Sequence, residues 1–131
     1  MINFRSSGEE MSNLKMSIET NWYDYDAGYS VGTVGADGGA IVRDEEHEAG
    51  ARITLEEEGN SAPFAVTCGI YGWMLHTRYF SEESEADDEY DQMKNELDGI
   101  LESIPAEEEN LDEETENEFW EKIELFVEKY P

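Results

Sequence analysis

The spacing of apolar residues changes at Ser81, and this change constrains the fold more than any other feature of the 131-residue chain. Before Ser81, apolar and polar side chains alternate in short runs separated by turns, which is typical of half-buried β-strands. After Ser81, apolar residues recur every three or four positions, which is the spacing of amphipathic helices. Strands that precede helices predict an α+β domain. We expect an antiparallel β-meander of four to five strands, followed by two C-terminal amphipathic helices packed on one face.

Four short strands are predicted in the first 60 residues. The alternation is clearest between Met16 and Tyr23, where every second side chain is apolar or β-branched. Residues 26–28, 35–39 and 59–61 contain glycine and predict tight turns, because glycine tolerates positive φ. Residues 44–50 predict a polar loop. The four predicted strands are residues 16–23, 29–34, 40–43 and 51–56.

Residues 63–80 form the most apolar part of the chain, and they are too long for one ordinary strand. A bend or tight turn is therefore expected near Gly69 and Gly72. Both parities of the segment carry large apolar side chains, so both faces are expected to be sheltered. Two helices cover only one face of a sheet. The other face is then buried either by a homodimer or by curling of the sheet. One face comprises Phe64, Val66, Cys68, Ile70, Met74, His76 and Phe80, and the other comprises Thr67, Tyr71, Trp73, Leu75 and Tyr79.

Two amphipathic helices are predicted after the strands. Ser81 is expected to cap the first, which covers residues 82–103. Asn110 and Glu113 have the spacing of a capping box at the start of the second. Trp120 either widens the second apolar stripe or lies at its edge. The predicted stripes are Ala86, Tyr90, Met93, Leu97, Ile100, Leu101 and Ile104 in the first helix, and Phe119, Ile123, Phe126, Val127 and Tyr130 in the second.

Length and composition predict one folded domain at residues 16–131, preceded by a disordered segment at residues 1–15. Cys68 is the single cysteine, so no intrachain disulfide can form and the fold does not require an oxidising compartment. The N-terminal residues contain no apolar run typical of a signal peptide, and no segment approaches the length of a membrane span. We therefore predict a cytoplasmic protein.

Acidic residues are concentrated in the C-terminal part of the chain. Residues 82–131 contain 21 Asp and Glu against three lysines, a net charge of −18. Such a surface attracts basic proteins and repels nucleic acid and anionic membranes. We expect a basic protein partner, and neither nucleic acid nor a membrane. The predicted partner-binding residues are Glu82, Glu85, Asp87, Asp88, Asp91, Glu113, Glu116 and Trp120.

The aromatic segment before the helices is where a pocket is expected. Cys68 and His76 could form a nucleophile and base, but eight residues of one straight strand would hold them about 26 Å apart. That pairing requires the chain to fold back near Gly72, and a buried cysteine that only fills space is the favoured alternative. His76 and Arg78 share a face and either line a cleft or pair with the acidic helices. The residues of the possible pocket are Cys68, Tyr71, Trp73, His76 and Arg78.

The sequence contains no motif that indicates a metal or another cofactor. His47-Glu48 lacks the second histidine of a helical zinc site, and Asp24 and Asp26 lack the spaced glutamate of a calcium loop. Glycines 35–39 fit a hairpin turn better than a phosphate-binding loop. We therefore expect no catalytic residues, no metal and no cofactor.

Residues 68–80, entered from residues 62–67 and followed by an acidic helix, resemble a small uncharacterised family of bacterial proteins. Across residues 16–131, the size, acidity and order of elements also resemble immunity proteins of bacterial toxin systems. That resemblance implies a small α+β protein that blocks a basic toxin, often a nuclease, with its carboxylates.

Three functions are compatible with the sequence. The first is a non-enzymatic acidic binding protein that docks a basic protein, as an immunity protein or a nucleic-acid mimic would. The second is a small-ligand-binding or enzymatic module with a cleft near Tyr71, Trp73, His76 and Arg78. The third is a structural, dimeric domain whose charge serves solubility, for example at high salt.

Overall fold

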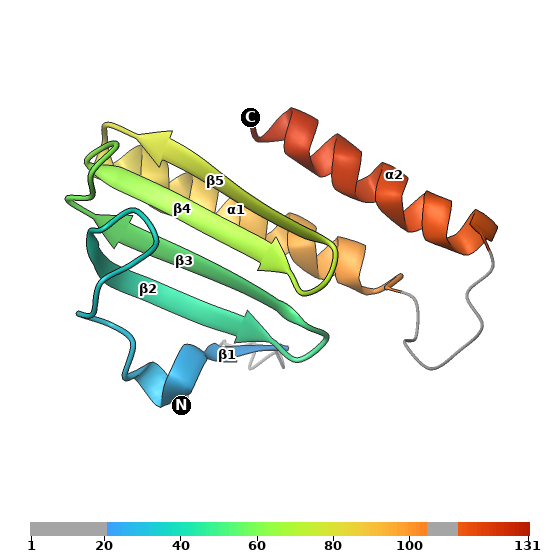
Figure 1. Cartoon of the computed structure of the whole chain (residues 1–131), viewed down its shortest axis with the longest axis horizontal. Coiled ribbons are helices and arrows are strands. Elements are labelled where there is room, and N and C mark those ends of the chain that lie inside the picture. The colour runs from blue at the N-terminus through green and yellow to red at the C-terminus, as the bar shows by residue number, and fades with distance from the viewer. Residues whose placement is uncertain (1–20, 105–112) are drawn as a thin grey trace, which may run out of the picture.

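The protein is a five-stranded antiparallel sheet followed by two helices, the first of which lies behind the sheet (Figure 1). The computed structural model describes residues 21–104 and 113–131. The predicted α+β arrangement, with strands first and helices last, is confirmed. The elements are β1 (Trp22–Asp24), the short helix η1 (Tyr25–Gly28), β2 (Ala40–His47), β3 (Ala51–Glu57), β4 (Phe64–Ile70), β5 (Met74–Phe80), α1 (Glu83–Leu101) and α2 (Glu113–Lys129).

The sheet is a meander in which each strand pairs with the next, in the order β1-β2-β3-β4-β5. Its longest apolar segment folds into the β4–β5 hairpin, as the length of that segment predicted. The hairpin turns at residues 71–73, where Gly72 has a φ of 83° that disfavours any residue with a Cβ. Cys68 therefore faces His76 across the two strands, although eight residues separate them along the chain.

Two predictions about the early strands are wrong. Residues 29–34 form turns, with only an isolated bridge between Val34 and Ala40. Positive φ angles at Gly28 and Gly32 interrupt the extended backbone that a strand needs. The predicted loop after residue 43 is instead the second half of β2. The charged side chains of this half fit a strand because Asp44, Glu45 and Glu46 each form hydrogen bonds on one face of the sheet or the other. Most of the strand predicted at residues 16–23 lies outside the described residues.

The helices have nearly the predicted bounds, but one predicted cap is wrong. The residue at the N-cap of α1 is Glu82, not Ser81, and its side chain makes no capping hydrogen bond. The capping residue predicted for α2, Asn110, lies outside the described residues, as does the segment predicted to be disordered. Every residue of the predicted α1 stripe except the half-buried Ile104 is buried, and so are Phe119, Ile123 and Phe126 of α2 and Tyr130 just after it.

The core lies between the sheet and the helix layer. α1 packs behind β3, β4 and β5, and α2 runs beside it, beyond β5 (Figure 1). We call the side of the sheet that meets the helices the covered face and the other side the open face. The residues predicted to share a face on β4 and β5 do share the covered face, where Val66, Cys68 and Ile70 are completely buried.

The open face is the point at which prediction and structure differ. Both faces of the sheet were expected to be buried. On the open face, however, Leu75 is 79% exposed and Tyr79 is 53% exposed. The sheet does not curl enough to bury these side chains within one chain. Curling, one of the two expected ways to cover this face, is therefore wrong, and the homodimer stays a prediction.

Candidate binding surfaces

The open face carries three carboxylates, and the first, Asp44 on β2, is bound by its neighbours on β3. The guanidinium group of Arg52 donates two hydrogen bonds to Asp44, at 2.9 and 2.7 Å, and the hydroxyl of Thr54 donates a third at 3.0 Å. This contact raises the pKa of Arg52, because the carboxylate stabilises the charged guanidinium. Asp44 is thereby neutralised within the sheet and is not available to a partner.

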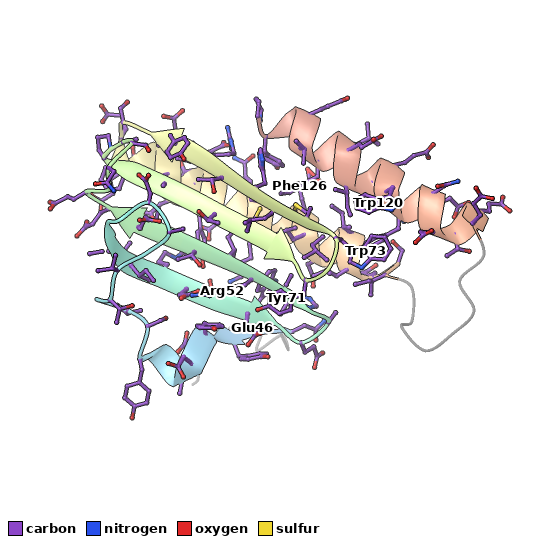
Figure 2. The ribbon with its side chains drawn as sticks, in the orientation of Figure 1. Glu46, Arg52, Tyr71, Trp73, Trp120 and Phe126 are labelled. Atoms are coloured by element: carbon purple, nitrogen blue, oxygen red, sulfur yellow. The ribbon has the colours of Figure 1, made fainter. Side chains whose placement is uncertain are left out.

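Glu46, the second open-face carboxylate, binds two tyrosines. The hydroxyl of Tyr71 donates a 2.7 Å hydrogen bond to Glu46, and the hydroxyl of Tyr23 donates another at 3.2 Å. Burial and the neighbouring carboxylate raise the pKa of Tyr71, so this phenol stays protonated as a donor. Figure 2 shows Glu46, Arg52 and Tyr71 gathered on the open side of the sheet. Arg52 also lies over the ring of Tyr25, at 3.6 Å.

Glu56 is the third carboxylate of the open face. It is almost fully buried and binds the backbone of the loop that precedes β2. Its carboxylate accepts hydrogen bonds from the backbone N–H groups of Asp37 and Gly39, at 2.8 to 3.1 Å. A Cβ on Gly35 would lie 2.8 Å from this carboxylate, so the close approach requires glycine. The loop between η1 and β2 is thus fixed over the open face (Figure 1).

A hollow of about 660 Å³ lies between that loop and the β4–β5 hairpin. Its floor includes Thr54, Thr67 and Thr77, which are aligned across three strands. Gly69 contributes no side chain to the floor. The rim is apolar, with Val34 on the loop and Leu75 on β5. Tyr71 and Cys68 are the two members of the predicted pocket that border this hollow, although the side chain of Cys68 lies in the core on the covered face.

The other three members of the predicted pocket lie elsewhere. Trp73 contacts the rings of Phe119 and Trp120, with ring centres 4.6 and 5.1 Å apart, and so joins the hairpin turn to α2 (Figure 2). His76 and Arg78 are on the covered face and bind the C-terminal residues. His76 donates to the carbonyl of Tyr130, and Arg78 donates to that of Pro131 and to the carboxylate of Glu89. The five residues do not form one pocket.

Cys68 and His76 are neighbours, but their environment does not support nucleophilic chemistry. Burial raises the pKa of the Cys68 thiol to about 12, only partly offset by the nearby charge of Arg78. At neutral pH the thiol is protonated and lies inside the core. The ring of His76 is occupied by the carbonyl of Tyr130. Cys68 is therefore an apolar filler of the covered face.

Basic side chains in the described part of the chain are all engaged. Five of the six bind carboxylates, and the sixth, Lys122, donates to the hydroxyl of Ser103. Arg43 reaches Asp91 at 3.0 Å and Asp87 at 3.5 Å, so two of the predicted partner-binding acids already have a basic partner. The remaining pairs are Arg52–Asp44, Arg78–Glu89, Lys94–Glu45 and Lys129–Glu96.

The other predicted partner-binding residues lie at two separate places. Exposed Glu82, Glu85 and Asp88 lie at the start of α1. Exposed Glu113 lies at the start of α2, which is the opposite end of the helix layer because the two helices run antiparallel (Figure 1). Glu116 is half-buried, and Trp120 is 39% exposed beside Trp73.

A larger acidic surface runs along the outer side of α2. Six exposed glutamates share this side, and none of them has an ion-pair partner within residues 21–104 and 113–131. Leu125, which is 65% exposed, lies among them. The helical spacing of these acids could have identified the surface, but only Glu113 was predicted. We call it the acidic α2 ridge: Glu113, Glu114, Glu118, Glu121, Glu124 and Glu128, with Leu125.

No group of His, Cys, Asp and Glu in the described residues is arranged to hold a metal ion. Neither described helix has the length and apolar character that crossing a membrane requires. Comparisons of the chain with models of protein families, with curated proteins and with solved structures found no match. The function must therefore be inferred from the surfaces themselves.

Proposed function

We propose that this protein is a non-enzymatic acidic binding protein that docks a basic protein through the acidic α2 ridge. One observation carries the proposal. The ridge displays six carboxylates without a basic partner in the described chain, whereas the carboxylates of the open face are each bonded internally. Unpaired surface charge is free to meet the charge of another protein.

The spacing of the ridge supports binding over general solubility. Glu114 and Glu118, and Glu124 and Glu128, are separated by four residues, so their carboxylates repel one another across one helical turn. Each such pair destabilises a helix by about 0.2 to 0.5 kcal/mol. Charge that served only solubility could be spread over the surface without this cost. A row of carboxylates at successive turns instead matches a partner with repeated cationic groups.

Leu125 supplies an apolar contact within the charge. Interfaces commonly place an apolar residue at the centre and polar residues around it, because the centre loses its water on binding. In the ridge, Glu121 precedes Leu125 by four residues and Glu128 follows it by three, so both flank it on the helix surface. Long-range attraction would bring a basic protein to the ridge, and Leu125 would then be buried.

The partner class that fits best is a protein that itself binds a polyanion, such as a basic nuclease. Repeated negative charge along a helix imitates the phosphates of nucleic acid, and occupying a nuclease's substrate surface would block it. This agrees with the resemblance to immunity proteins of bacterial toxin systems, and a cytoplasmic location would suit such a role.

The proposal is tested with two variants of equal net charge. The ridge variant carries Glu114→Gln, Glu118→Gln, Glu121→Gln and Glu124→Gln. The control carries Asp24→Asn, Asp26→Asn, Glu48→Gln and Glu58→Asn, all at exposed positions around the sheet. Immobilised wild-type protein captures partners from native lysate at low salt, and the affinity of each captured basic protein is then measured by calorimetry.

We expect the ridge variant to lose at least tenfold in affinity, and the control to lose little. The affinity of the wild type should also fall as salt rises. Equal losses in both variants would show that net charge alone matters, and the ridge would then not be a specific site.

A further inference from the structure

The open face differs from the rest of the surface because each carboxylate that its strands carry is already hydrogen-bonded within the chain. Residues 59–81, which include the whole β4–β5 hairpin, contain no Asp or Glu in a chain that has 34. The three carboxylates that β2 and β3 place on this face are bonded to Arg52, to tyrosine hydroxyls or to backbone N–H groups. The face therefore presents apolar side chains and satisfied polar groups to its surroundings.

The same face carries both a projection and a hollow. Val34, on the loop before β2, is 75% exposed, and Leu75, across the hollow on β5, is 79% exposed. Between them lies the hollow of about 660 Å³, whose floor lacks a side chain at Gly69. Around a two-fold axis, a projection on one copy can contact a hollow on the other, and the same contact is repeated in reverse. A projection beside a hollow is therefore the arrangement that two identical surfaces need to fit together.

We propose that the open face binds a second copy of this chain, so that two sheets stack face to face around a two-fold axis. The loop that carries Val34 in each copy enters the hollow of the other, against Leu75 and the glycine-lined floor. Tyr79, which is half-exposed on the same face, is covered at the edge. This interface is independent of the acidic α2 ridge and goes beyond the proposed function.

The distribution of charge favours a second copy as the occupant. The chain has a net charge of −26, so most ways of pairing two copies bring acidic surfaces together. Stacking the open faces places the helix layers on opposite outer sides of two sheets that lie about 10 Å apart. The two acidic ridges are then separated by more than the ~10 Å over which charges interact at 0.1 M salt. A basic partner, by contrast, would find the carboxylates of this face already occupied by hydrogen bonds within the chain.

The first test measures mass in solution. Sedimentation equilibrium at physiological salt should give wild-type protein twice the 15.0 kDa mass of the chain. Val34→Asp and Leu75→Asp should each give the mass of one chain, because they bring carboxylates into the apolar contact. The control, Leu125→Asp, places the same charge at an exposed leucine outside the open face and should remain a dimer. A wild-type monomer, or a dimer that survives both open-face substitutions, overturns the proposal.

The second test checks the geometry and does not depend on disrupting the dimer. Protein carrying Val34→Cys is mixed with protein carrying Leu75→Cys, and the mixture is oxidised under mild conditions. The native Cys68 is buried, so it does not react. We expect a disulfide between the two kinds of chain that forms in the mixture well above the level in either protein alone. Failure of the mixture to crosslink above that level contradicts the proposed contact of the loop with the hollow.

Discussion

The carboxylates of the sheet and those of α2 are the same chemical groups in opposite situations. Asp44, Glu46 and Glu56 lie on the open face, and each accepts at least two hydrogen bonds at or below 3.2 Å. The six glutamates of the acidic α2 ridge have no ion-pair partner in the described chain. The two groups of carboxylates differ because only those of the sheet lie close to a basic residue, a tyrosine hydroxyl or a backbone N–H group.

This difference shows that the acidity of the chain serves two purposes. The sheet uses carboxylates as structural acceptors that join strands and hold a loop. In the helix layer, Lys94 binds Glu45 of the sheet and Lys129 of α2 binds Glu96 of α1. The carboxylates of the acidic α2 ridge stay exposed to solvent. Removing an acid should therefore destabilise the protein in the sheet and stabilise it on α2.

Asp44→Ala should reduce the free energy of unfolding by about 3 kcal/mol. The substitution leaves the guanidinium of Arg52 and the hydroxyl of Thr54 without their acceptor, and breaking a buried ion pair from one side typically costs about 3–5 kcal/mol. We take the lower end because Arg52 is partly exposed. Urea unfolding measures the change. The milder control Thr54→Val removes a single hydrogen bond and should cost about 1 kcal/mol. A cost for Asp44→Ala no greater than that of the control would contradict a structural role.

Tyr90→Phe tests a carboxylate on the covered face. The buried hydroxyl of Tyr90 donates a 2.8 Å hydrogen bond to Glu45, and its loss should cost about 1.5 kcal/mol at neutral pH. Burial, followed by the charge of Glu45, raises the pKa of Tyr90 above that of an unfolded tyrosine.

A raised tyrosine pKa gives this contribution a defined pH range. The stability that the Tyr90 hydroxyl contributes is complete below pH ~10, where unfolded tyrosine is protonated. It is lost as the pH rises further. The stability difference between wild type and Tyr90→Phe should therefore narrow above pH ~10. A difference that stays constant from pH 8 to 11 would argue against the raised pKa.

The ridge variant with four glutamines at positions 114, 118, 121 and 124 should be more stable than wild type by about 1 kcal/mol at low salt. It removes repulsion between carboxylates on successive turns, at about 0.2–0.5 kcal/mol for each pair. Thermal unfolding monitored by circular dichroism measures the gain, which should shrink as salt screens the charges. If these substitutions instead destabilise the protein at every salt concentration, the ridge has a structural role that we have not assigned.

Asp37→Asn should have the smallest effect. The side chain of Asp37 accepts hydrogen bonds from the hydroxyl and backbone N–H of Ser61, and these lower the pKa of its carboxyl. A lowered carboxyl pKa stabilises the fold above the ordinary value near pH ~4, and this contribution is lost as the pH falls through the lower, folded value. The variant should be slightly less stable than wild type at pH 7 and indistinguishable from it in strong acid. Acid titration of both proteins, followed by tryptophan fluorescence, would reveal the opposite order if the interpretation is wrong.

Much of the fold could be predicted because it depends on local spacing. The apolar stripe of α1 and the alternation in β4 and β5 are read directly from the sequence, and the structure confirms both. The errors lie where local pattern is ambiguous. Residues 29–34 alternate like a strand, yet positive φ at Gly28 and Gly32 produces turns. The charged end of β2 resembles a loop until Arg52 on the next strand and Lys94 on α1 supply partners for Asp44 and Glu45.

The candidate surfaces could be predicted only in part. The excess acid was visible in the sequence, but which acids are free was not, because Arg43 selects Asp87 and Asp91 only after the sheet meets α1. The five residues of the predicted pocket do not lie together, for a related reason. Alternate residues of a hairpin point to opposite faces, so Tyr71 borders the open-face hollow while His76 binds the C-terminal end of the chain.

The sequence by itself determined the order of strands and helices, the faces that are apolar, and a large surplus of negative charge, because these follow from residue type and spacing. Only the tertiary structure decided which carboxylates remain free and which face of the sheet stays uncovered. Those outcomes depend on contacts between residues far apart in the chain. The few basic side chains can neutralise only the acids that folding brings within reach, and two helices can cover only one side of a sheet.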